Sequence, residues 1–335
     1  MASEPGVPLS SATIDRLAVA VYPSFALLAG MQLDVFTPLQ DGPLTAEEVA
    51  QALGVSPAKL RPLLYALVVA ELLTVDGGRF ANTPEAQQFL VRGRPTYLGG
   101  RQHIFVHNWQ ATLQTATTIR TGVPQDKLDF AHMSAEALAH FYRGLHPASV
   151  ATGRDLARRE DFSGARTLLD VGGGSGGLAL GLTERYPHLQ ATVVDLPSVT
   201  PITQQYIMEA GAQARVRVMA ADVVNDPLTG TFEVAVLKSF LQVLAPEQAR
   251  AALRHVSLAI TPGGVLYVIG IMLDNSRLSP PEAVARNLLF LNEYDVGQAY
   301  TEQEYTDWLR EAGFAEVTRV PIAEGNSILS ARKHA

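Results

Sequence analysis

The sequence contains no cysteine, and this absence removes several classes of chemistry together. Without a thiol the chain can form no disulfide, no thiolate zinc site and no cysteine nucleophile. Charge is also sparse: 18% of the residues are charged and the formal net charge is -7, so the overall electrostatics favour neither nucleic acid nor an anionic membrane. The hydrophobic content of 47% is typical of a folded globular protein.

Long uninterrupted hydrophobic runs are lacking as well. The most apolar stretches, 17–31 and 62–73, contain Pro23 and Glu71, and we expect both to fall short of a membrane span. Residues 1–10 have neither the basic region nor the apolar stretch of a secretory signal. These absences predict a cytoplasmic protein without a membrane segment.

The first part of the chain carries an unusually apolar helical pattern. At 335 residues the chain is too long for one ordinary core, so two domains are expected. From 11 to about 39, apolar residues recur at helical spacing with no charge between Arg16 and Asp34, and Pro23 is the expected kink. A helix this apolar must be buried, either within its own domain or against another chain.

Residues 45–95 predict a winged helix. Thr45 opens a capping box and a short helix, a second helix follows over 57–73, and a hairpin comes after it. A DNA-reading helix needs cations for the phosphates, yet the second helix offers only Lys59 and Arg61 before an apolar run. We therefore interpret this unit as a packing module that does not bind nucleic acid.

Residues 101–160 read as helices that contain several histidines. His103 and His107 are four residues apart, and His146 lies further along. The pair lacks the glutamate and the third ligand of a helical zinc site, so we predict no metal. These histidines are expected to lie partly buried between helices, where they remain candidates for lining a substrate pocket.

From residue 166 onward, predicted strands alternate with predicted helices. This alternation indicates an α/β domain with a doubly wound, mostly parallel sheet, and such sheets bind ligands at the carboxyl ends of their strands. The last two strands are separated by a short turn and predict an antiparallel hairpin at the sheet edge. The predicted strands are 167–171, 190–195, 216–220, 232–238, 264–273, 315–321 and 327–332.

A glycine-rich turn follows the first of these strands, and it fits two templates. Gly172, Gly174 and Gly177 satisfy the dinucleotide fingerprint, whereas Asp170, Gly172, Gly174 and Gly176 satisfy that of S-adenosylmethionine-dependent methyltransferases. Because glycine tolerates positive φ and leaves the backbone bare, either template brings a ligand against the turn.

Acids at the ends of successive strands distinguish between the two templates. Asp195 closes the second strand and suits ribose hydroxyls in both cases. Asp170 suits a cationic ligand, such as a sulfonium with its amino group, and is poorly placed beside a pyrophosphate. Asp222 follows the third strand, where a carboxylate can accept from an adenine amino group. The three acids favour S-adenosyl-L-methionine over a nicotinamide cofactor.

With these features the chain resembles class I methyltransferases of the caffeate, acetylserotonin and bacterial polyketide O-methyltransferase type. The resemblance implies a winged-helix dimerisation domain over 1–100, a helical connector lining the acceptor pocket over 101–160, and a Rossmann-like cofactor domain over 161–335. It also implies a homodimer and a small-molecule acceptor. The cofactor residues that it implies are Asp170, Gly172, Gly174, Gly176, Asp195, Leu196, Asp222, Val223 and Lys238, and the acceptor residues are Phe290 and Tyr294.

Two departures from this family concern the catalytic base. The histidine that deprotonates the acceptor hydroxyl in the family is replaced by Gln242, and a primary amide cannot take up a proton near neutral pH. The glutamate that orients this histidine is replaced by Ala299. The base and its orienting group are therefore both missing.

Three interpretations follow for an enzyme of this kind. Transfer to oxygen, carbon or nitrogen can proceed by alignment alone. Alternatively, another side chain acts as the base, the candidates being His103, His107, His146 and Tyr294. In the third interpretation the cofactor is bound but no methyl group moves. A different class of function, a winged-helix regulator that senses a small ligand, predicts salt-sensitive DNA binding.

Overall fold

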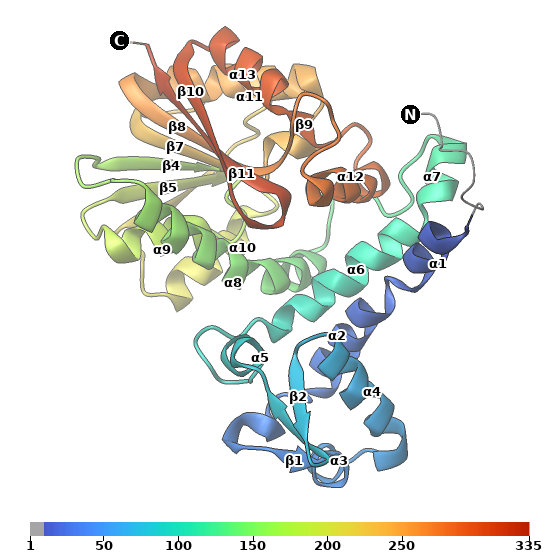
Figure 1. Ribbon diagram of the computed structural model, residues 1–335. Coiled ribbons are helices and arrows are strands. Elements are labelled where there is room, and N and C mark those ends of the chain that lie inside the picture. The colour runs from blue at the N-terminus through green and yellow to red at the C-terminus, as the bar shows by residue number, and fades with distance from the viewer. Residues whose placement is uncertain (1–9, 335) are drawn as a thin grey trace. The chain divides into compact units, whose positions relative to one another are not determined.

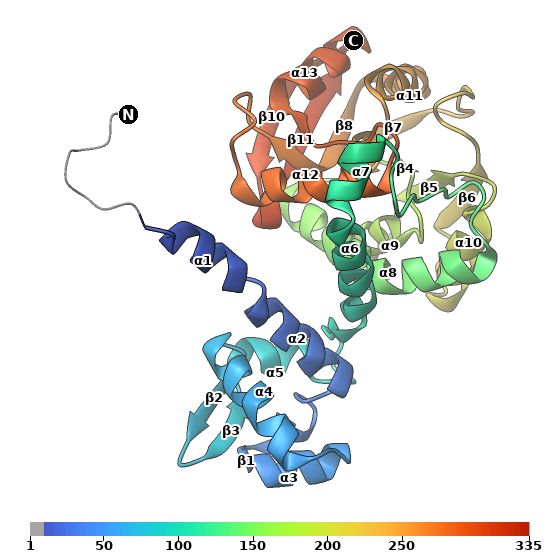
Figure 2. The same cartoon turned by 90° about the vertical axis from the view of Figure 1, so that its right-hand side faces the viewer.

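The computed structural model describes residues 10–334 and divides the chain into two compact units, Met1–Phe105 and Val106–Ala335. Most of the connector predicted over 101–160 therefore folds together with the sheet that follows it. Figures 1 and 2 show the elements of both units in two views at right angles.

The first unit contains the predicted helix–turn–helix and hairpin. Thr45 forms the expected capping box, since its side chain accepts from Glu48 N while the Glu48 carboxylate accepts from Thr45 N. Buried apolar side chains from α2, α4 and the hairpin form one core. The three strands are ordered β1-β3-β2. The elements are α1 (Ala12–Val19), α2 (Tyr22–Leu33), η1 (Pro38–Asp41), β1 (Leu44–Thr45), α3 (Ala46–Leu53), α4 (Pro57–Val69), β2 (Leu73–Asp76), β3 (Arg79–Asn82), α5 (Pro84–Phe89) and η2 (Gly99–Arg101).

The apolar N-terminal segment is broken where the proline predicted it. Helix α1 ends at Val19, and α2 starts at Tyr22 with Pro23 in its first turn, where a missing N–H costs no hydrogen bond. Leu17 is 60% exposed and Tyr22 is 63% exposed, so the first unit does not bury this face. The segment therefore divides between the two expected locations: Ala26 and Met31 are buried in the core of the first unit, whereas the face that carries Leu17 and Tyr22 is left exposed.

The expectation that this segment falls short of a membrane span was wrong. Among the described residues, Ala12–Leu33 is long and apolar enough to cross a membrane, with a mean hydropathy of 1.3. Helices α3 and α4 pass the same test only when counted as one span across a bend of 112°. Length and composition do not tell whether such a helix lies in a bilayer or packs on an apolar protein surface, because both environments accept the same apolar side chains.

The second unit is a mixed sheet covered by helices on both faces, as Figure 1 shows. The strand order is β10-β11-β8-β7-β4-β5-β6, with β9 paired to β8 off this path. The strands from β4 to β8 pair in parallel, and β10 and β11 form the predicted antiparallel edge. The strands are β4 (Thr167–Val171), β5 (Gln190–Asp195), β6 (Val216–Ala220), β7 (Phe232–Lys238), β8 (Ile260–Leu273), β9 (Tyr300–Thr301), β10 (Phe314–Pro321) and β11 (Asn326–Lys333).

Two apolar clusters, one on each face, hold the helices to this sheet. One joins the sheet to α11 and α13, and the other joins it to α8, α9 and α10. Gly153, Gly177 and Gly181 let α8 cross α9 closely, because a Cβ at any of them would lie within 3 Å of the other helix. The helices are α6 (Gln102–Leu113), which spans the division, α7 (Thr115–Thr121), α8 (Ala135–Arg159), α9 (Gly177–Arg185), α10 (Thr200–Glu209), α11 (Pro246–Ala259), α12 (Pro281–Glu293) and α13 (Glu302–Glu311), with short 3-10 turns η3 (Leu241–Val243) and η4 (Ala323–Gly325).

Candidate active site

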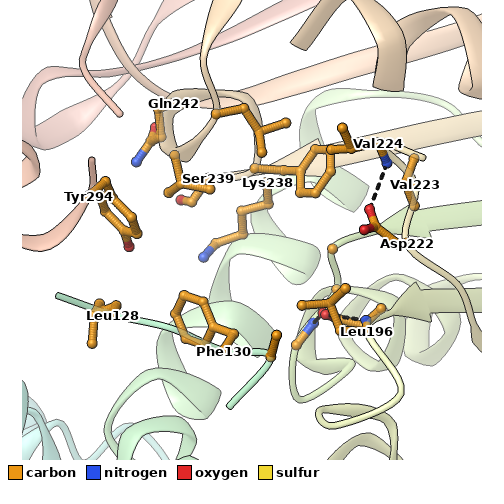
Figure 3. Close-up of a pocket in the computed structure, with 18 of the residues that line it drawn as sticks. Leu128, Phe130, Leu196, Asp222, Val223, Val224, Lys238, Ser239, Gln242 and Tyr294 are labelled. Atoms are coloured by element: carbon orange, nitrogen blue, oxygen red, sulfur yellow. Dashed lines mark hydrogen bonds between the residues drawn. The ribbon is translucent and has the colours of Figure 1, made fainter. Parts of the chain in front are cut away.

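A cavity of about 560 Å³ lies within the second unit, where β4, β5 and β7 end and α8 and the segment 127–131 pass by. Figure 3 shows Lys238 reaching into its middle, with Gln242 and Tyr294 on one side and Leu196 and Asp222 on the other. Its position at the carboxyl ends of the parallel strands is the one that the alternating pattern predicted.

The glycine turn after β4 forms part of the cavity wall with bare backbone. Gly172 has φ +62° and Gly174 has φ +56°, a region that other residues adopt at a cost. A Cβ on Gly172 would lie 2.4 Å from the Phe240 ring, and one on Gly174 would lie 2.5 Å from Tyr142. Gly176 also has positive φ, but it caps α9 and does not line the cavity. The turn therefore requires glycine for both its conformation and its space.

Asp170 is fully buried at the end of β4 and also contributes to the cavity wall. Its Oδ2 accepts from Ala179 N at 3.3 Å, while its Oδ1 is buried without a hydrogen-bond partner among the described residues. Burial raises the pKa of Asp170 to about 7, against the opposing effects of the Ala179 hydrogen bond and the Lys238 charge. A buried carboxylate oxygen without a partner is costly, so this atom favours a donor supplied by a ligand.

The two following acids are held by local backbone. Asp195 accepts from Gly174 N at 2.7 Å and from Leu196 N at 2.8 Å, which ties the end of β5 to the glycine turn. Burial raises the pKa of Asp195 to about 6. Asp222 accepts from Val224 N at 3.0 Å and from the Asn225 side chain at 2.7 Å. All three strand-end acids and the neighbouring Leu196 and Val223 line the same cavity.

Lys238 is the only lysine at the end of a strand in the cavity wall. Its Nζ donates to Ser149 Oγ at 3.4 Å, and burial lowers its pKa while the charge of Asp170 opposes this shift. The next residue, Ser239, has φ +54° and donates its N–H to Ile269 O at 2.7 Å. This sharp turn after β7 directs the chain toward Phe240 and Gln242, which line the cavity beyond it.

Gln242 is buried and held by the neighbouring strand. Its Oε1 accepts from Ile271 N at 3.1 Å, in a space that exists because Gly270 has no side chain: a Cβ there would lie 2.4 Å from Oε1. Ala299, the position to which the resemblance assigns the family's orienting glutamate, is fully buried in an apolar cluster with Phe290 and Ile271. The described structure therefore contains no carboxylate at position 299 that could orient a base.

The candidate bases from the sequence do not meet in this cavity. His103 is exposed near the start of α6. His107 lies 3.0 Å from Glu293 and 3.5 Å from Asp126 and is not a lining residue. His146 contacts Ser175 Oγ at 2.9 Å and stacks on Tyr206 behind the wall. Of the four candidates, only Tyr294 lines the cavity, and burial raises its pKa well above the ordinary value.

The two acceptor residues implied by the resemblance are also separated. Tyr294 points into the cavity (Figure 3), whereas Phe290 packs behind it in the apolar cluster, with 6.2 Å between the ring centroids. Phe290 therefore supports Tyr294 and does not line the cavity.

The sequence predicted that the connector over 101–160 lines the pocket, but it did not identify the individual residues of this part of the wall. Helix α8 contributes one face, whose spacing of one, three and four residues is a helical signal that could have identified it. The segment after α7 has no periodicity and gave no such signal. The lining residues in question are Leu128, Phe130, Phe141, Tyr142, Leu145, Ser149, Ser239 and Phe240.

The fold and the cavity together define a Rossmann-like α/β protein with a ligand site at the carboxyl ends of its parallel strands. The model of the O-methyltransferase domain matches residues 118–315, and that of the O-methyltransferase dimerisation domain matches residues 16–92. The chain therefore belongs to the O-methyltransferase family, whose enzymes use S-adenosylmethionine as the methyl donor.

Comparison with characterised relatives agrees with this assignment. A 3-hydroxy-5-methyl-1-naphthoate 3-O-methyltransferase of Streptomyces sahachiroi is 33% identical over 92% of this chain and 90% of its own length. An N,N-dimethyltransferase of Streptomyces rimosus is 32% identical over 94% of each chain. The structure of human N-acetylserotonin methyltransferase with S-adenosylmethionine has the same fold, with a TM-score of 0.83 at 23% identity over 99% of this chain and 100% of that one.

Proposed function

We propose that the cavity binds S-adenosylmethionine beside a small aromatic acceptor and that the enzyme methylates a hydroxyl of this acceptor without an imidazole base. The observation that carries the proposal is a single cavity containing a glycine cradle, the unpartnered Oδ1 of Asp170 and the polar pair Gln242 and Tyr294. The first two features suit a cofactor with a cationic amino acid portion, and the third suits an acceptor.

The residues present fit the cofactor. Asp170 offers a buried acceptor oxygen, and the turn at Gly172 and Gly174 offers backbone that a side chain would obstruct. Asp195 and Asp222 would face the ribose and the adenine, with Leu196, Val223 and Lys238 completing this part of the wall. When bound, S-adenosylmethionine supplies a methyl group on a positively charged sulfur, which makes the carbon open to in-line attack.

The residues of the cavity wall position the acceptor and exclude water from the cavity. Phe130, Phe141 and Tyr142 pack against one another with ring centroids 5.3 to 6.5 Å apart, and they give the cavity an aromatic wall that suits a flat acceptor. Holding the two reactants in line can account for several kcal/mol of the barrier, about 7 kcal/mol in favourable cases. The acceptor must therefore be able to react without giving its proton to a histidine of the protein.

One of the named relatives supports an aromatic acceptor. The Streptomyces sahachiroi enzyme acts, by its name, on a hydroxynaphthoate. The Streptomyces rimosus enzyme is named as an N,N-dimethyltransferase, and this relative is the observation that keeps transfer to nitrogen as the second candidate. A nitrogen acceptor with a free lone pair likewise needs no base before attack.

The dimerisation domain supports a proposal on the partner and the compartment. We infer that α1 and α2 pair with a second copy of the chain through the exposed apolar face, and that the protein is cytoplasmic because this face is then covered by protein.

Incubation with methyl-labelled S-adenosylmethionine and a panel of phenols, hydroxyquinones and aromatic amines tests the function. We expect label in an acidic hydroxyl acceptor and binding of S-adenosylhomocysteine by calorimetry. Binding of S-adenosylhomocysteine with no label in any acceptor would leave only the non-transferring interpretation.

A further inference from the structure

The side-chain amide of Gln242 has a fixed direction. Its Oε1 accepts from Ile271 N at 3.1 Å, so the oxygen must face the strand, because the opposite orientation would set two donors against each other. Gly270 supplies the space for this oxygen. Nε2 consequently faces away from the strand, and it donates no hydrogen bond to any residue in the described part of the chain.

The free end of this amide faces the acceptor side of the cavity. Figure 3 shows its nitrogen directed toward the space beside Tyr294, with the Lys238 ammonium group further into the cavity. Tyr294 keeps its proton because burial raises its pKa, so it too can donate. Of the acids that line the cavity, Asp295 is the one next to Tyr294, and its carboxylate is paired with Lys127 at 2.5 Å.

We propose that Gln242 is a specificity-determining residue whose N–H groups bind an acceptor oxygen that is already anionic. This inference rests on the proposed function and names its substrate class: an aromatic or quinonoid hydroxyl made acidic by conjugation to a carbonyl or another withdrawing group. In the family a histidine removes the proton of the acceptor. In this enzyme the amide N–H groups of Gln242 would select acceptors that are already deprotonated.

The proposed methyl transfer needs no protein base to accept the proton. The acceptor hydroxyl releases its proton to water before or during binding. Its anionic oxygen then forms the new O–C bond while the C–S bond to the methyl group breaks and its electron pair passes to sulfur. A hydrogen bond to a charged oxygen is stronger than one to a neutral oxygen, so the amide favours the anion over the phenol.

Equilibrium binding tests this selectivity apart from turnover. The probes are 2-hydroxy-1,4-naphthoquinone, whose hydroxyl is acidic, and 2-naphthol, a bicyclic phenol that is not. With S-adenosylhomocysteine present, absorbance titration gives the pKa of each bound probe. We expect the bound quinone to have a lower pKa than the free quinone, and its anion to bind at least about tenfold more tightly than 2-naphthol.

Two variants of the glutamine pocket assign the effect to Nε2. Gln242→Glu keeps an oxygen for Ile271 N and removes both donors, so the pKa shift of the quinone should disappear and binding should weaken about tenfold or more. Gly270→Ala leaves the glutamine in the sequence but forces its Oε1 to move, and it should reproduce the loss. Circular dichroism and thermal unfolding show whether each variant folds, and either folded variant suffices.

Gln248→Glu is the matched control. Gln248 also lines the cavity and its Oε1 also accepts from a backbone N–H, that of Ala245 at 2.9 Å. The same change of an amide to a carboxylate there should alter the pKa of the bound quinone much less than Gln242→Glu does, because it adds a charge to the cavity but leaves the Gln242 donors in place. An equal loss in Gln248→Glu would attribute the effect to added negative charge in the cavity and would contradict the proposal.

Failure of this inference and failure of the proposed function give different results. If S-adenosylhomocysteine binds and both probes are methylated equally well, with no effect of Gln242→Glu, the function stands and the selectivity does not. If no probe or panel compound is methylated, the function fails. Gln242→His supplies a positive test: it should add methylation of 2-naphthol to that of the quinone.

Discussion

The imidazole of His107 lies between two carboxylates, with Nε2 3.0 Å from Oε1 of Glu293 and Nδ1 3.5 Å from Oδ2 of Asp126. Both contacts are ion pairs when the imidazole is protonated. Beside them, Asp126 N donates to Asn292 O and Leu128 N donates to Glu293 O. These contacts hold the segment 126–128, which leads into the cavity wall, against the end of α12.

This arrangement predicts a pH-dependent contribution to stability. Contact with Glu293 raises the pKa of His107 above 6.5, despite burial, and burial raises the pKa of Glu293. Because the folded-state pKa of His107 is raised, its contribution is complete below its unfolded value and is lost as the pH rises through the folded value.

His107→Gln should therefore lower the free energy of unfolding by about 1–3 kcal/mol at pH 6, since it leaves the Glu293 carboxylate buried without a cation. The deficit should shrink toward pH 8. Chemical denaturation at both values measures it, with the exposed His132→Gln as the control. A deficit that is equal at the two pH values would contradict the ion pair.

Asp170→Asn separates cofactor binding from folding. The substitution keeps an oxygen for Ala179 N but removes the charge of the unpartnered carboxylate, so S-adenosylhomocysteine should bind about tenfold or more weakly. The stability of the apo-protein should change little, because the substitution removes a buried carboxylate but also takes the charge of Asp170 away from the buried Lys238. Calorimetry measures the first effect and thermal unfolding the second. Unchanged affinity would remove Asp170 from the cofactor site.

The same residue predicts how the stability of the ligand-free protein varies with pH. The folded pKa of Asp170 is raised from 3.8 to about 7, so its contribution is complete below about 3.8 and is lost as the pH rises through about 7. Asp170→Asn should flatten this part of the stability profile, measured by denaturation between pH 4.5 and 8 in the absence of ligand. If the stability of the variant and of the wild type varied with pH in the same way, the pKa of Asp170 would not be raised in the folded protein, and the prediction would be contradicted.

Gly174→Ala tests the glycine cradle. Positive φ costs an alanine about 1–2 kcal/mol, and the added Cβ would meet the Tyr142 ring, so both stability and S-adenosylhomocysteine affinity should fall. Gly164→Ala is the control, because its φ is ordinary and its Cβ would enter open space. Wild-type affinity in a folded Gly174→Ala protein would show that the turn does not contact the cofactor.

Leu17→Asp tests the dimer. Leu17 is 60% exposed on the apolar face of α1, and a carboxylate buried at an interface without a partner is costly. Light scattering should show a dimer in the wild type and a monomer or a weakened dimer in the variant. Leu258→Asp, at a 77% exposed position on α11, should remain dimeric. A monomeric wild type, or the same mass for all three proteins, would contradict pairing through α1.

The central sheet could be predicted from the sequence almost residue by residue. The strands over 167–171, 190–195, 216–220 and 232–238 have the predicted bounds. Three of them, β4, β5 and β7, are buried for most of their length, and buried parallel strands read as short apolar runs between turn residues. The short strand β9 carried no such signal. The orientation of Gln242 could not be predicted either, since it depends on Gly270, a residue on another strand that no local pattern connects to it.

The dependence of kcat/KM on pH for methylation of 2-hydroxy-1,4-naphthoquinone tests the central claim most directly. Without a histidine base, the rate should follow ionisation of the acceptor alone and stay level through the range in which imidazole titrates. Gln242→His should introduce a new inflection in that range. An inflection near pH 6–7 in the wild-type enzyme, abolished by substitution of a histidine, would contradict the account.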